Sequence, residues 1–168
     1  MIKKIILTIT IIFAACAGYF FKSQSLVVQR PSLEKLYDVP ASIPDYFEIE
    51  EEFYAVNFFA SWCSSCRSEL DDLAKMKKIS GINIYGIAVN DSENQLREML
   101  HNKAELFKKI TVNFPLHSLS ELNLNRIPRI LIIYKGDVIY DHTGEVNSRI
   151  LEKKILPILK EIKNKSKR

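Results

Sequence analysis

The hydrophobic pattern of the chain changes period several times, and each change predicts an element. Residues 54–59 form a short apolar run rich in aromatic side chains, which is typical of a strand covered on both faces. Over residues 64–79 apolar positions recur at helical spacing, and Gly81 predicts the helix end. Residues 82–89 are a second apolar strand. Strand, helix and strand of these lengths predict a right-handed crossover that joins parallel strands.

The next part of the chain predicts helix. Asp91 and Ser92 open a helix, because Ser92 and Gln95 have the spacing of a capping box and the residues up to 100 carry apolar positions on one helical side. Residues 105–110 are expected to continue or restart this helix. Beyond them the pattern predicts only an extended piece and one or two helical turns, at residues 114–116 and 119–124.

The last third predicts an antiparallel hairpin followed by a helix. Residues 129–134 and 138–140 are apolar strands joined by a tight turn that contains glycine. Residues 148–162 form an amphipathic helix with a kink or break expected at Pro157. The order of elements predicts an α/β fold with a mixed central sheet, in which parallel and antiparallel pairs lie between two layers of helices.

The N-terminus has the pattern of an export signal. Lys3 and Lys4 precede residues 5–21, which carry no charge and reach the lower limit of about 17 residues for a membrane-spanning helix. A cleaved signal peptide, a lipoprotein acylated at Cys16 and a retained anchor are all open. Each places the domain outside the cytoplasm, where disulfides form. We therefore divide the chain into a signal peptide or transmembrane anchor, a linker and lead-in with one short edge strand, and a folded domain, at residues 1–22, 23–45 and 46–168.

Composition narrows the class of protein. With 168 residues, of which 47% are hydrophobic, the chain can bury one sizeable core. The net charge of +4 arises in part from basic residues at both ends of the chain. Since aromatic residues are not interleaved with them, we interpret the basic tail as solvated and expect no nucleic-acid partner.

The cysteine pair in the segment WCSSC is the candidate chemistry. A structural zinc site takes four ligands, but no second Cys or His pair has suitable spacing, so we predict no metal. A disulfide between residues three apart closes too small a loop to stabilise the fold much. Cys63 falls where a strand ends and a helix begins, and the helix N-terminus favours a thiolate there. The pattern predicts dithiol–disulfide exchange, with Cys63 as nucleophile and Cys66 as the more buried resolving thiol.

These residues resemble the thioredoxin superfamily. The segment WCSSC follows an apolar strand, and Ile127-Pro128 precedes a later strand, as in that superfamily. Asn57 and Glu69 are similar to residues of the membrane-tethered extracytoplasmic reductases (the TlpA/ResA-like group). The segment YDHTGE at residues 140–145 resembles the thiol–disulfide interchange proteins of cytochrome c maturation (CcmG/DsbE).

The resemblance implies a fold and a function. The fold is a thioredoxin-like three-layer sandwich. The function is that of a reductant on a single-pass anchor in the bacterial inner membrane, whose periplasmic domain keeps the cysteines of apocytochrome c reduced. Its partners are then apocytochrome c or its thiol chaperone and a membrane thiol-electron transporter, and no cofactor beyond the redox-active cysteines is expected.

The resemblance also implies roles for individual residues. Cys63, Cys66 and Glu69 are catalytic; the active-site support consists of Trp62, Asn57, Ile127 and Pro128. Pro128 follows a cis peptide bond in the family, where the backbone of Ile127 pairs with a substrate. Spacing alone leaves Glu69 open between a proton shuttle and an acid favoured by the helix dipole.

Some features depart from the family pattern and leave alternatives open. Ser64 and Ser65 replace a pair that usually contains proline, and because these two residues tune the redox potential, the resemblance alone does not carry over the family's value. Arg129 stands where a small polar or acidic residue is usual, and a basic group there is expected to stabilise a thiolate. A reductase or disulfide oxidase with other clients is one alternative, and a copper-binding thioredoxin-like module that uses His142 is another.

Overall fold

The computed structural model describes residues 37–38, 43, 47–103, 105–112 and 126–165. The chain divides into two compact units, Met1–Pro31 and Ser32–Arg168, and the described residues all belong to the second. The predicted export segment and the pieces at 114–116 and 119–124 lie outside the described residues. Among the residues that are described, no helix is both long and apolar enough to cross a membrane.

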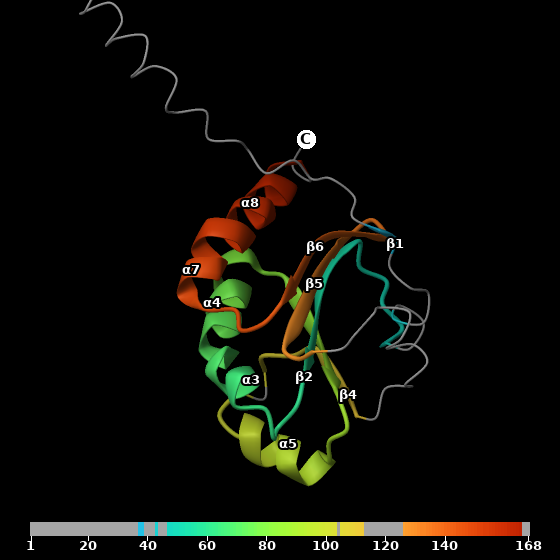
Figure 1. The fold of residues 1–168 in the computed structure, drawn as a ribbon. Helices are drawn as coiled ribbons and strands as arrows, with labels where there is room; N and C mark the ends of the chain where they lie inside the picture. The colour runs from blue at the N-terminus through green and yellow to red at the C-terminus, as the bar shows by residue number, and fades with distance from the viewer. Residues whose placement is uncertain (1–36, 39–42, 44–46, 104, 113–125, 166–168) are drawn as a thin grey trace, which may run out of the picture. The chain divides into compact units, whose positions relative to one another are not determined.

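A mixed sheet forms the centre of the described unit (Figure 1). Its strands are β1 (Tyr37–Asp38), β2 (Phe53–Phe59), β3 (Asn83–Ala88), β4 (Lys109–Val112), β5 (Arg129–Tyr134) and β6 (Asp137–Thr143). They lie in the order β1-β6-β5-β2-β3-β4. β2 pairs in parallel with β3, and β3 with β4, whereas β5 pairs antiparallel with β2 and with β6. The predicted crossover and hairpin are therefore both confirmed.

The short strand β1 lies within the predicted lead-in and pairs antiparallel with β6. It supplies the edge strand expected there. The turn of the hairpin has Lys135 and Gly136 both in the left-handed region, at φ 54° and 82°. Two such residues form the turn whose twist matches that of paired antiparallel strands.

The helices are α3 (Ser64–Ser68), α4 (Leu70–Ser80), α5 (Glu93–Leu100), α7 (Ser148–Ile150), the π-helix η2 (Leu151–Ile155) and α8 (Leu156–Lys165). The single helix predicted for residues 64–79 is thus two helices that meet at Glu69. Gly81, at φ 75°, ends the second of them as expected. Ser92 caps α5 by accepting the amide of Gln95.

Two predicted helical segments differ from the structure. Residues 105–110 do not continue α5, because Lys108 N donates to Ile84 O across 2.7 Å and strand β4 begins at Lys109. The open edge of β3 provides hydrogen-bond partners that the helical pattern cannot reveal. In the C-terminal helix, the irregularity expected at Pro157 is the π-helical turn η2 just before α8. Proline lacks the N–H that a regular α-helix needs, and the wider turn takes up the mismatch.

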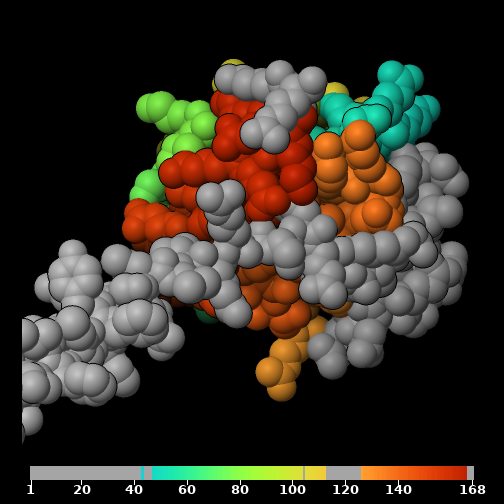
Figure 2. All heavy atoms as spheres, turned by 90° about the horizontal axis from the view of Figure 1, so that it is seen from above, coloured from blue at the N-terminus to red at the C-terminus, as the bar shows by residue number. Residues whose placement is uncertain are grey.

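Alternation along the strands divides the core into two clusters. One contains Ala55, Phe59 and Ile132 and packs against α4, α5 and α8. On this side of the sheet, α8 lies next to α4 and next to the β5–β6 hairpin, as Figures 1 and 2 both show. The other contains Val56, Phe58 and Leu131, with Ile43 and Phe47 packed among them. The second helical layer stays a prediction, since residues 39–42, 44–46 and 113–125 are not described.

Candidate active site

The two cysteines lie at the junction between β2 and α3. A turn closed by Cys63 N donating to Ala60 O, at 3.2 Å, follows the end of β2. Cys63 is the N-cap of α3, and its Sγ accepts the amide of Cys66 at 3.2 Å. The two sulfurs form a disulfide, with their Cα atoms 5.2 Å apart. Ser65 Oγ lies 3.3 Å from Cys63 Sγ. The Cys66 amide and the Ser65 hydroxyl both lie within hydrogen-bonding distance of Cys63 Sγ at the helix N-terminus, an environment that favours a thiolate.

The two cysteines differ in their exposure to solvent, and Trp62 directly precedes the more exposed one, Cys63. Cys63 keeps 8% of its surface exposed, whereas Cys66 has none. An attacking sulfur must reach a partner, and a resolving sulfur must not, so this asymmetry fits the expected division of roles. Trp62 is 56% exposed, and its indole N–H donates to Asn90 O at 3.1 Å.

Glu69 is fully buried at the break between α3 and α4. Its carboxylate accepts hydrogen bonds from Asn57 Nδ2 and from Val146 N, both at 2.9 Å. Burial raises the pKa of Glu69 to about 7, although the two hydrogen bonds act in the opposite direction. The structure thus places a buried carboxyl group with a raised pKa three residues after Cys66.

Asn57 ties Glu69 to the central strand β2. The side chain is fully buried, and its Oδ1 has no hydrogen-bond partner among the described residues. A buried amide oxygen without a partner costs about 1–3 kcal/mol. The Asn57 side chain therefore donates to the Glu69 carboxylate through Nδ2, while its Oδ1 has no hydrogen-bond partner among the described residues.

The segment before β5 carries the other predicted support residues. The Ile127–Pro128 peptide bond is cis, the conformation that the resemblance implies. Pro128 O accepts the amide of Gly144 at 2.7 Å, and Ile127 packs against the core cluster that contains both cysteines.

The side chain of Arg129 has a different environment from the one the sequence suggested. Its guanidinium donates from Nε and Nη2 to the two carboxylate oxygens of Asp141, at 2.8 and 2.5 Å. Both side chains are largely buried. A carboxylate on β6 thus offsets the positive charge that we expected to act on a thiolate.

Several residues at the site belong to no sequence motif. Asp91 accepts hydrogen bonds from Ser61, and Arg67 donates to Ser61 O. The sequence showed Asp91 only as part of a helix start. Val146 N meets Glu69 across 77 positions of sequence, and no local pattern signals such a contact.

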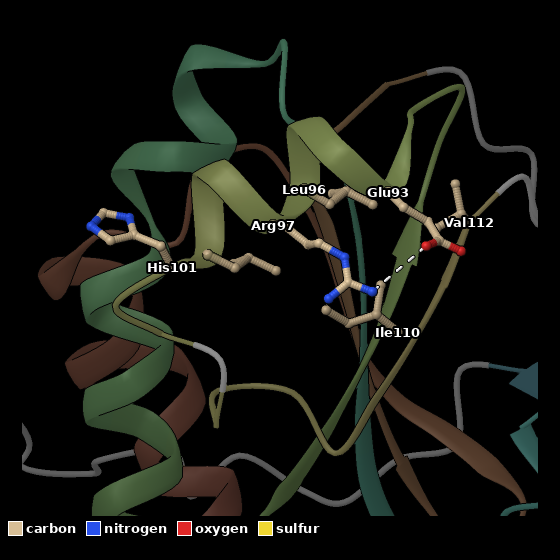
Figure 3. A pocket seen from close by; sticks show the side chains of 7 residues that line it. Glu93, Leu96, Arg97, His101, Ile110 and Val112 are labelled. Atoms are coloured by element: carbon tan, nitrogen blue, oxygen red, sulfur yellow. Dashed lines mark ion pairs between the residues drawn. The ribbon is translucent and has the colours of Figure 1, made fainter.

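A surface pocket lies apart from this group of residues (Figure 3). Leu96, Leu100 and Ile110 line it between α5 and β4, and an ion pair joins Glu93 to Arg97 at its rim. None of the predicted site residues lines it. His142 lies on β6, where its ring is stacked on that of Tyr140 with the ring centroids 6.3 Å apart. In the described part of the chain no three His, Cys, Asp or Glu side chains are grouped to hold a metal ion.

Comparison with known proteins gives consistent similarities. No family model matches the chain. It is 27% identical over 107 residues to the thiol:disulfide interchange protein DsbE of Yersinia pestis, covering 62% of this chain and 56% of the relative. It is 26% identical over 105 residues to the thiol:disulfide interchange protein HelX of Rhodobacter capsulatus, covering 62% and 59%. The chain thus spans little more than half the length of these relatives.

Solved structures show the same fold. A secreted thiol-disulfide isomerase from Corynebacterium glutamicum matches with a TM-score of 0.56 at 22% identity, covering 68% of this chain and 75% of that one. A thiol:disulfide interchange protein of the thioredoxin family from Chlorobium tepidum matches with a TM-score of 0.53 at 23% identity, covering 66% and 79%. These similarities establish a thioredoxin-like fold.

Proposed function

We propose that this chain, which has a thioredoxin-like fold and is similar to thiol:disulfide interchange proteins, is a thiol–disulfide oxidoreductase that reduces disulfides through Cys63 and Cys66. The observation that carries the proposal is the cysteine pair itself. Cys63, which keeps 8% of its surface exposed at a helix N-terminus, is joined to the fully buried Cys66, and the buried carboxyl group of Glu69 follows three residues later. A structural disulfide would need neither the asymmetry nor the carboxyl group.

The reaction begins from the dithiol form. The Cys63 thiolate attacks one sulfur of a client disulfide, forming a mixed disulfide and releasing the other client sulfur as a thiolate. Cys66 then attacks Cys63 Sγ, which frees the second client sulfur and leaves the Cys63–Cys66 disulfide. Two electrons pass from the protein to the client, and a dithiol donor must restore them.

Glu69 acts in the second step. Cys66 is buried, and a buried thiol is a weak nucleophile until it loses its proton. The carboxylate of Glu69, with a pKa raised to about 7, is matched to accept that proton near neutral pH and later return it to solvent or to the departing sulfur. Asn57 and Val146 hold the carboxyl group in place for this transfer.

The proposals for the client and for the cellular location rest on the resemblance to the interchange proteins of cytochrome c maturation. We propose apocytochrome c or its thiol chaperone as client, and a membrane thiol-electron transporter as donor. Similarity to DsbE and HelX supports this choice. We further propose that residues 1–22 direct or anchor the domain to the periplasmic side of the bacterial inner membrane, as their export pattern suggests.

Two measurements test the proposal. The reduction potential, followed by Trp62 fluorescence in dithiothreitol or glutathione buffers, is expected near that of thioredoxin, about −270 mV. A value near −120 mV, typical of a strong oxidant, would contradict the assignment as reductase. The second is reduction of an oxidised apocytochrome c peptide with two cysteines, compared with an unrelated disulfide peptide of the same loop length. Equal rates for the two peptides would refute the client and leave the chemistry standing.

A further inference from the structure

We infer that Asp91 is a positioning residue for the redox turn, defined here as residues 60–63, and that it holds this turn so that Cys63 stays at the N-terminus of α3. Asp91 lies in the connection that follows β3, outside every motif that pointed to the site. The inference rests on the proposed function for its consequence, because the position of Cys63 matters only if its sulfur reacts.

The contacts of Asp91 converge on one residue of the turn. Its Oδ1 accepts Ser61 Oγ at 2.7 Å, and its Oδ2 accepts the backbone amide of Ser61. Oδ1 also accepts the amide of Ser92 at 2.8 Å. Asp91 is only 8% exposed. A carboxylate so far removed from water needs good hydrogen bonds to offset its lost hydration, and bonds to an ionised acceptor are the stronger kind.

Neighbouring groups reinforce the same connection. The Arg67 guanidinium donates to Ser61 O, so the amide, the carbonyl and the hydroxyl of Ser61 are all engaged. Trp62 donates its indole N–H to Asn90 O, the residue just before Asp91. Asn90 has a φ of 48°, a left-handed conformation that asparagine tolerates better than most residues. Two residues after β3 thus hold two residues of the redox turn.

The turn ends at the reactive sulfur. Cys63 N closes it on Ala60 O, and Cys63 Sγ accepts the amide of Cys66. If Ser61 were released, residues 60–63 could change conformation, and Cys63 Sγ could turn away from the Cys66 amide. The thiolate would then lose the donors that stabilise it.

A positioning role and a purely electrostatic role for Asp91 predict opposite changes in the pKa of Cys63. A nearby negative charge disfavours a thiolate, so an Asp91 that acted by charge alone would raise the pKa of Cys63, and its removal would lower it. An Asp91 that acts by holding the turn keeps the pKa of Cys63 low, and its removal raises it. The sign of the change therefore separates the two roles.

The test is the pH dependence of iodoacetamide alkylation of Cys63 in the reduced full-length protein, kept in detergent. We expect Asp91→Ala to raise the pKa of Cys63 by about one unit. At a pH below the pKa of Cys63 in the parent, the variant should be alkylated about threefold more slowly than the parent. It has about tenfold less thiolate, but its more basic sulfur is a better nucleophile and offsets part of that loss. An unchanged or lowered pKa of Cys63 would overturn the inference.

Two further variants keep the test decisive. Ser61→Ala removes one contact to Asp91 without changing any charge, and a smaller rise in the pKa of Cys63 is expected. If Asp91→Ala does not fold, a folded Ser61→Ala protein with the parent pKa would overturn the inference. Ser92→Ala is the matched control, because it removes the α5 cap on the far side of Asp91 and should leave the pKa of Cys63 unchanged. Alkylation needs no client, so this test can fail or succeed independently of whether the parent protein reduces the apocytochrome c peptide.

Discussion

Asn57 donates a hydrogen bond to Glu69 across 2.9 Å, and neither side chain is exposed to solvent. The pair joins the central strand to the break between α3 and α4. A fully buried carboxyl group favours its neutral form, so the folded protein binds the proton of Glu69 more tightly than the unfolded chain does. Stability and activity are therefore both expected to depend on the ionisation of this group.

Glu69→Gln is expected to remove a pH-dependent loss of stability. The pKa of Glu69 rises from 4.5 to about 7 on folding, so the free energy of unfolding falls as pH increases from 4.5 to about 7 and stays low above it. The full loss is about 3 kcal/mol. Glutamine has no charge to bury. Its oxygen can still accept the Val146 amide, and its NH2 can donate to Asn57 Oδ1, which has no partner among the described residues in the parent, once the Asn57 amide turns over.

Urea unfolding of the oxidised protein at pH 4 and pH 8 checks this expectation. At pH 8 the variant should exceed the parent in free energy of unfolding by about 1–3 kcal/mol, while at pH 4 the two should agree within about 1 kcal/mol. Glu98→Gln, an exposed change on α5, provides the matched control. If the difference in free energy of unfolding between variant and parent were the same at both pH values, Glu69 would not be a buried titrating acid.

The same variant should slow resolution of the mixed disulfide. Without a carboxylate to accept the Cys66 proton, attack of Cys66 on Cys63 is expected to slow by about 100-fold, the lower range for loss of a general base. Rapid acid quenching should then trap the mixed disulfide with the client. The first attack, measured in a Cys66→Ser background with and without Glu69→Gln, should change little. If both steps slowed equally, Glu69 would act on the nucleophile rather than on the resolving thiol.

The Arg129–Asp141 ion pair is expected to be costly to break from one side only. Both side chains are largely buried, so Asp141→Ala leaves a guanidinium without this counter-charge and should lower the free energy of unfolding by about 3 kcal/mol. Arg129→Met combined with Asp141→Leu should cost less than the sum of the single changes. Strict additivity in this double-mutant cycle would argue against a direct interaction.

Gly86 marks a close approach inside β3. A Cβ atom there would lie 2.9 Å from the Phe59 ring and 3.1 Å from the side chains of Phe107 and Ile110. The rings of Phe59 and Phe107 are stacked with centroids 4.9 Å apart and leave little room to adjust. Gly86→Ala should therefore lower the free energy of unfolding by about 1–3 kcal/mol. Adding Ile110→Ala should recover part of that loss, whereas a Gly86→Ala protein as stable as the parent would contradict the packing.

Local pattern in the sequence was sufficient for most of the elements and for the reactive pair. Apolar runs and helical spacing identified β2, β3, the hairpin and the C-terminal helix, because these patterns reflect which side of each element is buried. The spacing of Cys63 and Cys66 at the end of a strand pointed to redox chemistry for a similar local reason. Where a local pattern met an open sheet edge, as at residues 105–110, the prediction was wrong, because β3 offered hydrogen bonds that no local signal reports.

Only the tertiary structure decided what surrounds the cysteines. Whether Glu69 is a surface acid or a buried, hydrogen-bonded one depends on Asn57 and Val146, which lie 12 and 77 positions away in sequence. The same holds for Asp91, which reaches Ser61 across 30 positions, and for Arg129, whose charge is offset from the neighbouring strand. Hydration and charge are properties of a three-dimensional environment. A single sequence determined which groups can react, and packing determined how readily each gains or loses a proton.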